Sequence, residues 1–426
     1  MTRDVVARSA ARAAAPGPRV AWLVGPALVA GVAYLDPGNV ASNMTAGAGY
    51  GYLLVWVVVL ANVMAWLIQY LSAKLGIVTG QSLPETLGRR IRNRWARRAY
   101  WLQAELVAMA TDIAEVIGGA VALNLLFALP LVWGGVITGL VSVGVLMLQS
   151  KRGPRTFESV VIALVVVIAV GFTVGVFVAP PDPGGVLGGL VPRFQGTDSV
   201  LLAASILGAT IMPHAIYAHS ALARDRFAPH LPHEDLEAGR GIGTARLLRA
   251  TRWDVTIAMA IAGTVNLCIL LLAAANLQGV AGTETLEGAY AALRDGIGPV
   301  VATLFAVGLL ASGLASTSVG AYAGAEIMHG LLHVRVPMLA RRLVTLVPAL
   351  AILALGVDPT LALVLSQVVL SFGIPFALIP LVRLTAQRAV LGPFRNRVIT
   401  TVAGIAASVF LIALNGVLLG LLITGG

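Results

Sequence analysis

The stretch A-Y-L-D-P-G-N-V-A-S, residues 33–42, decides the fold because it places polar groups inside one of the most apolar parts of the chain. Pro37 has no backbone N–H, so a helix through this stretch cannot bond the carbonyl of Ala33, four residues earlier. The glycine that follows adds backbone freedom. We therefore expect the helix to unwind here and to expose the Ala33 carbonyl beside the side chains of Asp36 and Asn39. Broken backbone within a membrane is tolerated only where it lines a cavity or is buried in protein.

The composition is that of a protein that crosses a membrane many times. The chain has 426 residues, of which 58% are hydrophobic and 11% charged, and its mean hydropathy is +0.90. A soluble domain carries about 25% charged residues. The single cysteine, Cys268, excludes an internal disulfide and a cysteine-based zinc or iron–sulfur site. The sequence has no glycine-rich phosphate loop of the Walker type, so we do not expect ATP to drive its activity.

Windows of about 20 apolar residues predict eleven membrane-spanning helices and an all-α fold. The windows lie near residues 21–45, 51–78, 100–129, 132–150, 157–179, 199–222, 253–276, 298–328, 340–357, 359–382 and 398–423. We expect residues 21–426 to form one transmembrane domain, preceded by a basic cytoplasmic tail at residues 1–20. A separate soluble domain is not expected.

The distribution of basic residues tests this series of spans. With the N-terminus in the cytoplasm, all of the 29 Lys and Arg residues except Arg193 and Arg294 fall on the cytoplasmic side. Such asymmetry follows the positive-inside rule, and it predicts a multi-pass protein of the cell membrane with an extracytoplasmic C-terminus. The net charge of +10 is then a consequence of topology. A nucleic-acid partner is not expected, because no stretch interleaves basic and aromatic residues as a binding face would.

A second proline-broken helix is predicted in the sixth window, which reads L-G-A-T-I-M-P-H at residues 207–214. Pro213 frees the carbonyl of Ala209 in the same way, and Met212 and His214 flank the break. Taken alone, a proline in a membrane helix indicates no more than a kink, because proline is common in such helices.

The two breaks open the two halves of the first ten spans, residues 21–179 and 199–382. Interrupted segments in corresponding positions of two halves are typical of inverted-repeat transporters, which bind their substrate there. Carboxylate, carboxamide and carbonyl oxygens suit a hard cation, and the Met212 thioether shifts the preference toward transition metals and away from Mg²⁺ or Ca²⁺. The alternative for Met212 is a side chain that only fills the core.

Acidic and basic side chains also occur inside two other spans. Glu105, Asp112 and Glu115 are seven and three residues apart, so they share one face of the third span. Arg341 and Arg342 begin the otherwise apolar ninth span. The alternative for the acids is a satisfied network between helices, and the alternative for the arginines is a pair of anchors that snorkel to the membrane surface.

The sequence resembles the Nramp (natural resistance-associated macrophage protein) family of proton-coupled divalent metal transporters, bacterial manganese-type branch, over close to its full length. The resemblance is carried by D-P-G-N at 36–39, M-P-H at 212–214, L-G-I-V-T-G at 75–80, A-T-D-I-A-E-V-I-G at 110–118, L-L-A-S-G at 309–313 and L-S-Q-V-V-L-S at 365–371. It implies a LeuT-like fold, an inverted repeat of 5+5 helices plus an eleventh, with spans 1 and 6 unwound. It also implies symport of protons with Mn²⁺, Fe²⁺ or a similar ion into the cytoplasm. The ion is then a substrate, no cofactor is needed, and the chain is not an enzyme.

Site residues follow from the resemblance by position. The implied metal ligands are the side chains of Asp36, Asn39 and Met212 and the carbonyls of Ala33 and Ala209. The implied proton pathway consists of Asp112, Glu115, His214 and Arg342, with Glu105 and Arg341 beside them. In one place the chain departs from the family: L-Q-L-P-F-A is frequent there, and this chain has F-G-I-P-F-A, with Gly373 at the glutamine position. A side-chain ligand from span 10 is therefore expected to be missing, which puts the exact metal preference in doubt.

Two other functions fit a membrane protein with broken helices. A sodium-coupled amino-acid symporter of the same architecture would present backbone N–H groups to a substrate carboxylate, which Asp36 would repel. An intramembrane enzyme would need a nucleophile–base pair or a metal-bound water, and the spans contain no such pair outside the two breaks. Divalent metal transport is favoured over both.

Overall fold

The computed structural model describes residues 25–152, 154–227, 242–334 and 336–424, and within these ranges the chain forms helices and no strands. The basic tail predicted at residues 1–20 lies outside the described residues. The helices in the predicted windows are α2 (Pro26–Gly31) with η2 (Val32–Leu35) and α3 (Pro37–Tyr50), α4 (Val55–Thr79), α6 (Arg94–Phe127), α7 (Leu131–Arg152), α8 (Pro154–Val178), α10 (Gly196–Thr210) with α11 (Pro213–Phe227), α13 (Thr244–Asn276), α15 (Pro299–Leu332), α16 (Met338–Ala354), α17 (Pro359–Ala386) and α19 (Val398–Thr424). Shorter elements between them are η3 (Gly51–Leu54), α5 (Leu83–Arg90), α9 (Pro183–Gly188), α14 (Leu286–Gly296), α18 (Arg388–Leu391) and η5 (Gly392–Phe394).

Eight helical segments of the described residues are long and apolar enough to cross a membrane. The pair α2–η2 and the Leu131–Gly144 part of α7 are shorter apolar helices. α16 has 17 residues, which is at the lower limit for crossing the hydrocarbon layer, and two arginines lie near its start. The chain is a multi-pass membrane protein, as its composition predicts.

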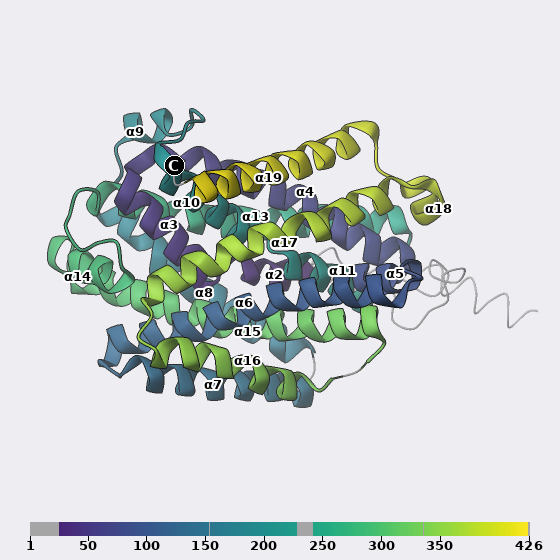
Figure 1. The fold of residues 1–426 in the computed structure, drawn as a ribbon, viewed down its shortest axis with the longest axis horizontal. Coiled ribbons are helices and arrows are strands. Elements are labelled where there is room, and N and C mark those ends of the chain that lie inside the picture. The colour runs from purple at the N-terminus through teal and green to yellow at the C-terminus, as the bar shows by residue number, and fades with distance from the viewer. Residues whose placement is uncertain (1–24, 153, 228–241, 335, 425–426) are drawn as a thin grey trace, which may run out of the picture.

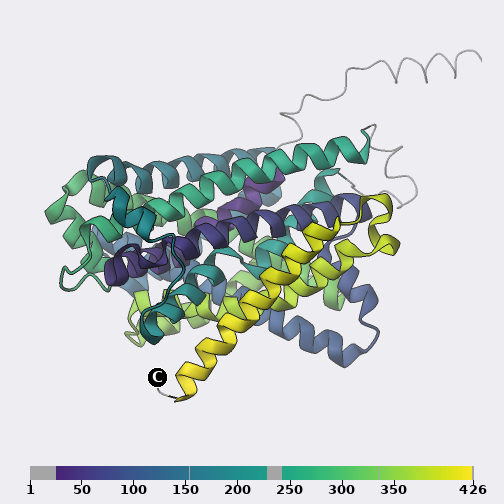
Figure 2. The same cartoon turned by 90° about the horizontal axis from the view of Figure 1, so that it is seen from above.

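Corresponding helices of the two predicted repeats make corresponding contacts. α3 of the first half packs against α13, and α11, its counterpart in the second half, packs against α4. In the same way α15 packs against α8, and α17 packs against α6. This exchange of partners is what an inverted repeat produces. α19 follows the second half and lies beside α17 at the outer surface of the bundle (Figures 1 and 2).

Small residues allow the helices of the two halves to approach closely. At the contact between α4 and α11, a Cβ on Gly76 would lie 2.1 Å from the carbonyl oxygen of Ser220. The Ser72 hydroxyl donates to the Ile216 carbonyl at 2.6 Å across the same contact. Close backbone contact with an interhelical hydrogen bond is the usual means of helix association in membranes, and here it fixes α11 against the first half.

Candidate functional site

The D-P-G-N motif forms a break between two helices. η2 ends at Leu35 and α3 begins at Pro37, with Asp36 in an extended conformation between them (φ −69°, ψ 165°). Asp36 caps α3, because its Oδ1 accepts a 2.7 Å hydrogen bond from the backbone N–H of Asn39. Proline suits the first helical position, where its missing N–H would have no partner. The predicted unwinding of span 1 is confirmed.

The carbonyl of Ala33 is only partly released by this break. Pro37 cannot bond it, but the backbone N–H of Asp36 does so across a 3₁₀ turn at 3.3 Å. The carbonyl is thus free of the α-helical bond, as expected, and a local 3₁₀ bond occupies one side of it. A carbonyl oxygen has two lone pairs, so Ala33 retains one for a ligand.

The next two carbonyls of the break are held by other helices. Asn266 of α13 donates to the Tyr34 carbonyl at 2.9 Å, and the hydroxyl of Ser312 of α15 donates to the Leu35 carbonyl. Each buried backbone acceptor of the unwound turn thus has a partner, as polar groups inside a membrane require. These side chains hold the break in a fixed position against the bundle.

Span 6 is broken in the same manner. α10 ends at Thr210 and α11 begins at Pro213, with Ile211 at φ −111° and ψ 52°. Pro213 cannot donate to the carbonyl of Ala209, so this oxygen is released from the helix. Met212 lies in the break and is fully buried.

The two breaks meet at the side chain of Asn39. Its Nδ2 donates to Asp36 Oδ1 at 2.9 Å and to the Ala209 carbonyl at 2.8 Å. Two predicted oxygen ligands from different halves therefore face a common point. A half-turn of the amide would bring Asn39 Oδ1 to that point as a third oxygen. All of the predicted ligand residues are fully buried, with 0% of their surface exposed: Ala33, Asp36, Asn39, Ala209 and Met212.

The electrostatics of this point favour a cation. The carboxyl-terminal end of α10 directs carbonyl dipoles toward it, and such helix ends attract positive charge. Asp36 adds a carboxylate. The described part of the chain has no cluster of three or more His, Cys, Asp or Glu side chains that could hold a metal ion, so a bound ion would depend on a ligand set of one carboxylate with amide, carbonyl and thioether groups, which is what the two breaks offer. The meeting of the two breaks is therefore the candidate metal site.

Gln367 of α17 is a site residue that the sequence analysis did not assign. Its Nε2 lies 3.4 Å from Asp36 Oδ2, and its Oε1 is buried without a hydrogen-bond partner among the described residues. The close approach depends on Gly208, where a Cβ would lie 1.9 Å from the Gln367 carbonyl oxygen. A Cβ on Gly373 would instead meet Val107 of α6 at 2.5 Å. Span 10 therefore brings a glutamine within hydrogen-bond distance of Asp36, at Gln367 and not at the position of Gly373.

A buried network of ion pairs joins α6 to α16. Arg341 Nε lies 2.9 Å from Glu105 Oε1, and its Nη1 lies 3.0 Å from Asp112 Oδ2. Arg342 Nη1 lies 3.1 Å from Asp112 Oδ1 and 3.2 Å from Glu115 Oε2. The structure thus brings the three acids of the third span together with both arginines of the ninth.

Arg342 is not a surface anchor. It is 1% exposed, and its guanidinium also donates to Ser142 Oγ at 3.0 Å and to Thr317 Oγ1 at 3.2 Å. The snorkelling interpretation is wrong for this residue. The network contains three carboxylates and two guanidinium groups, and Glu115 Oε1 has no hydrogen-bond partner in the described part of the chain. One proton on a carboxyl would balance the charge, and an unbalanced buried charge is costly.

Two buried histidines follow the break in α11. His214 Nδ1 lies 3.2 Å from Thr111 Oγ1, in the same turn of α6 as the ion-pair network. His219 Nδ1 lies 2.6 Å from Gln69 Oε1 of α4, and the Gln69 amide contacts the hydroxyl of Tyr34. His214 thus follows the break directly and contacts α6 one residue before Asp112, and His219 connects α11 to the first half.

Residues 27–421 match the family described as "Natural resistance-associated macrophage protein-like". The "Divalent metal cation transporter MntH" of Mycobacterium tuberculosis is 62% identical over 404 residues, which cover 95% of this chain and 92% of the relative.

Solved structures agree with this match. A mutant of the manganese transporter of Eremococcus coleocola superposes with a TM-score of 0.81 at 33% identity, over 92% of this chain and 85% of that one. MhsT, solved in complex with L-phenylalanine, superposes with a TM-score of 0.62 at 12% identity, over 95% of this chain and 98% of that one. This second likeness shows the LeuT-like fold alone. With two proline-broken helices that meet at the side chain of Asn39 and a match over nearly its whole length, the chain belongs to the Nramp family.

Proposed function

We propose that this chain moves a divalent transition-metal ion, Mn²⁺ or Fe²⁺, into the cytoplasm together with protons. The observation that carries the proposal is the convergence of Asp36 Oδ1 and the Ala209 carbonyl on the amide of Asn39. The printed names of the similar proteins, a divalent metal cation transporter and a manganese transporter, support it. The amino-acid alternative is disfavoured, because a substrate carboxylate would meet the carboxylate of Asp36.

In the proposed cycle the ion exchanges its hydration shell for protein ligands. These ligands are Asp36, Asn39, the Met212 sulfur and the carbonyls of Ala33 and Ala209, with Gln367 within reach of Asp36. The broken spans then rock against the rest of the bundle and open the site to the other side. We place the basic end of the bundle in the cytoplasm. A membrane potential of 100 mV, negative inside, then favours the inward movement of a doubly charged ion by roughly 4.6 kcal/mol.

We propose that the ion-pair network carries the coupled proton. The network has one more carboxylate than it has guanidinium groups. A proton can therefore bind the carboxylate of Glu115 or Asp112, beside Arg342. His214, which follows the break of span 6 and contacts Thr111 beside Asp112, is the proposed link between this network and the metal site. When a proton crosses with the metal ion, the proton's electrochemical gradient adds to the force that drives the metal ion inward.

Calorimetry on the purified chain in detergent separates the two transport classes. We expect Mn²⁺ to bind with one site per chain and leucine or alanine to give no binding heat. Proteoliposomes that contain the chain should accumulate Mn²⁺ faster when the outside is made acidic. Binding of leucine without binding of Mn²⁺ would contradict the proposal and favour the amino-acid symporter.

Met212→Ala tests whether the sulfur is a ligand. We expect the preference for Mn²⁺ over Ca²⁺ in competition uptake to fall on the order of tenfold, because the thioether favours the softer ion. Met44→Ala is the matched control, since Met44 is a buried methionine of α3 outside the break. If both variants keep the same Mn²⁺/Ca²⁺ ratio as the unchanged chain, the Met212 sulfur serves only for packing.

A further inference from the structure

α17 is kinked near its middle, and the first released carbonyl is closed off by α19. Pro375 lies inside the helix and cannot bond the carbonyl of Ser371, four residues earlier. Asn415 of α19 donates to this carbonyl at 2.9 Å and accepts a 2.9 Å bond from the Ser371 hydroxyl. The polar groups exposed by the kink are therefore satisfied within the protein.

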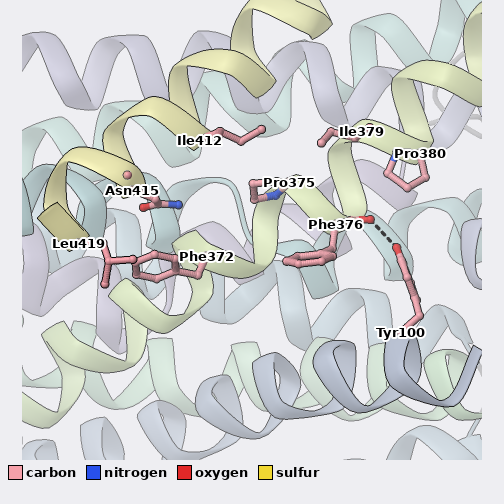
Figure 3. A pocket seen from close by; sticks show the side chains of 10 residues that line it. Tyr100, Phe372, Pro375, Phe376, Ile379, Pro380, Ile412, Asn415 and Leu419 are labelled. Atoms are coloured by element: carbon pink, nitrogen blue, oxygen red, sulfur yellow. Dashed lines mark hydrogen bonds between the residues drawn. The ribbon is translucent and has the colours of Figure 1, made fainter. Parts of the chain in front are cut away.

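The second released carbonyl of α17 is closed off from the other side. Pro380 cannot bond the carbonyl of Phe376, and the hydroxyl of Tyr100 of α6 donates to it (Figure 3). Tyr100 is also 3.0 Å from the Tyr217 hydroxyl of α11. Two prolines thus bend α17 and leave neither of these carbonyls for water to bond.

An apolar groove of about 490 Å³ lies between α17 and α19 beside these two prolines. Phe372 and Phe376 from α17 and Ile412 and Leu419 from α19 line it (Figure 3). Phe376 is 50% exposed and Ile412 49% exposed, on the outer surface of the bundle. In a chain that crosses the membrane, this surface faces lipid, so hydrocarbon is the occupant that matches the lining.

Two arginines lie one helical turn beyond residues that line the groove. Arg383 follows Ile379 by one turn on the same face of α17, and Arg97 precedes Tyr100 by one turn on α6. Arg383 is exposed. Arg97 Nη1 donates to the Gly88 carbonyl at 3.4 Å, and its Nε has no hydrogen-bond partner in the described ranges. A basic group near the membrane surface attracts anionic lipid headgroups.

We propose that the groove binds one anionic phospholipid of the leaflet at the basic end of the bundle, with an acyl chain between α17 and α19 and the phosphate near Arg383 and Arg97. The site is separate from the metal site and does not depend on which ion is transported. It places a lipid against α17, the helix that also carries Gln367.

The acyl chain is tested by filling the groove. Gly416 lines it, and a Cβ at this position meets no atom within 4 Å, so Gly416→Phe should fold normally. Native mass spectrometry of the delipidated chain, titrated with dioleoylphosphatidylglycerol, should show about tenfold weaker binding, the loss expected for roughly two buried methylene groups. Gly420→Phe is the matched control, because Gly420 has equal space on α19 and does not line the groove.

The headgroup is tested by comparing phosphatidylglycerol with dioleoylphosphatidylcholine. We expect the unchanged chain to bind the anionic lipid at least about fivefold more tightly than the zwitterionic one. Arg383→Gln should weaken binding of the anionic lipid about fivefold and leave binding of the zwitterionic lipid unchanged. Arg395→Gln is the control, because Arg395 lies at the same end of the bundle but not one turn beyond a residue that lines the groove. It should change the affinity for neither lipid. Equal binding of phosphatidylglycerol by Gly416→Phe and Gly420→Phe, or equal affinity of the unchanged chain for the two lipids, would overturn the proposal.

Discussion

Asp36→Asn is expected to reduce Mn²⁺ uptake into proteoliposomes to the background of empty vesicles. The substitution keeps the size of the side chain and removes its charge. A dication about 4 Å from a carboxylate gains roughly 8 kcal/mol at an effective dielectric constant of about 20, and the remaining neutral ligands cannot replace this attraction. Calorimetry should likewise show no Mn²⁺ binding to the variant.

The fold should survive this substitution, which makes the result interpretable. Asp36 caps α3, and asparagine is as good a cap as aspartate. Asp358→Asn is the matched control, because Asp358 caps the N-terminus of α17 by accepting a 2.7 Å hydrogen bond from the backbone N–H of Leu361. Uptake by Asp36→Asn at the rate of Asp358→Asn would show that the carboxylate does not hold the transported ion.

Glu115→Gln is expected to uncouple protons from the metal. The variant would leave two carboxylates against two guanidinium groups, so the network would be balanced without a bound proton. Its amide oxygen can still accept the hydrogen bond from Arg342, now 3.2 Å from Glu115 Oε2. We expect Mn²⁺ binding to remain and the protons moved per Mn²⁺ to fall to near zero, measured with a pH-sensitive dye inside the vesicles.

Glu326→Gln is the control for this experiment. Glu326 of α15 also pairs with an arginine, Arg224, at 3.1 Å, and it lies outside the network of α6 and α16. Its proton-to-metal ratio should equal that of the unchanged chain. A Glu115→Gln variant that keeps full acid-driven uptake and an unchanged ratio would show that the proton takes another path.

The two breaks could be predicted from sequence because their cause is local. A missing N–H at Pro37 or Pro213 acts on a carbonyl four residues away, whatever the rest of the chain does. Asp36 and Asn39 lie beside the first break in sequence, so their place in the site followed. The 3₁₀ bond to Ala33 was not predictable, since the choice between a 3₁₀ turn and an open carbonyl depends on the helices packed around the break.

Gln367 was missed for the opposite reason. It lies in a long apolar helix with no break near it, and its neighbours do not indicate which face of α17 meets Asp36. The motif F-G-I-P-F-A indicated a missing glutamine at Gly373, six residues further on. Gly373 packs against α6. A buried glutamine among apolar residues in L-S-Q-V-V-L-S was the available signal, since a polar side chain inside a membrane helix indicates function.

The arginines of α16 show a related limit. Their sequence position, at the start of an apolar segment, fits both a surface anchor and a buried ion pair. The acids that decide the question lie on α6, more than two hundred residues earlier in the chain. Only the packing of α16 against α6 and α15 places Arg342 among Asp112, Glu115 and Thr317.

The most direct test of the account is anomalous diffraction from crystals grown with Mn²⁺. We expect one strong anomalous peak that is bonded both to the carboxylate of Asp36 and to the carbonyl of Ala209, with the Met212 sulfur in the same shell. A peak that is bonded to one break only, with the other too far away to share the ion, would contradict it.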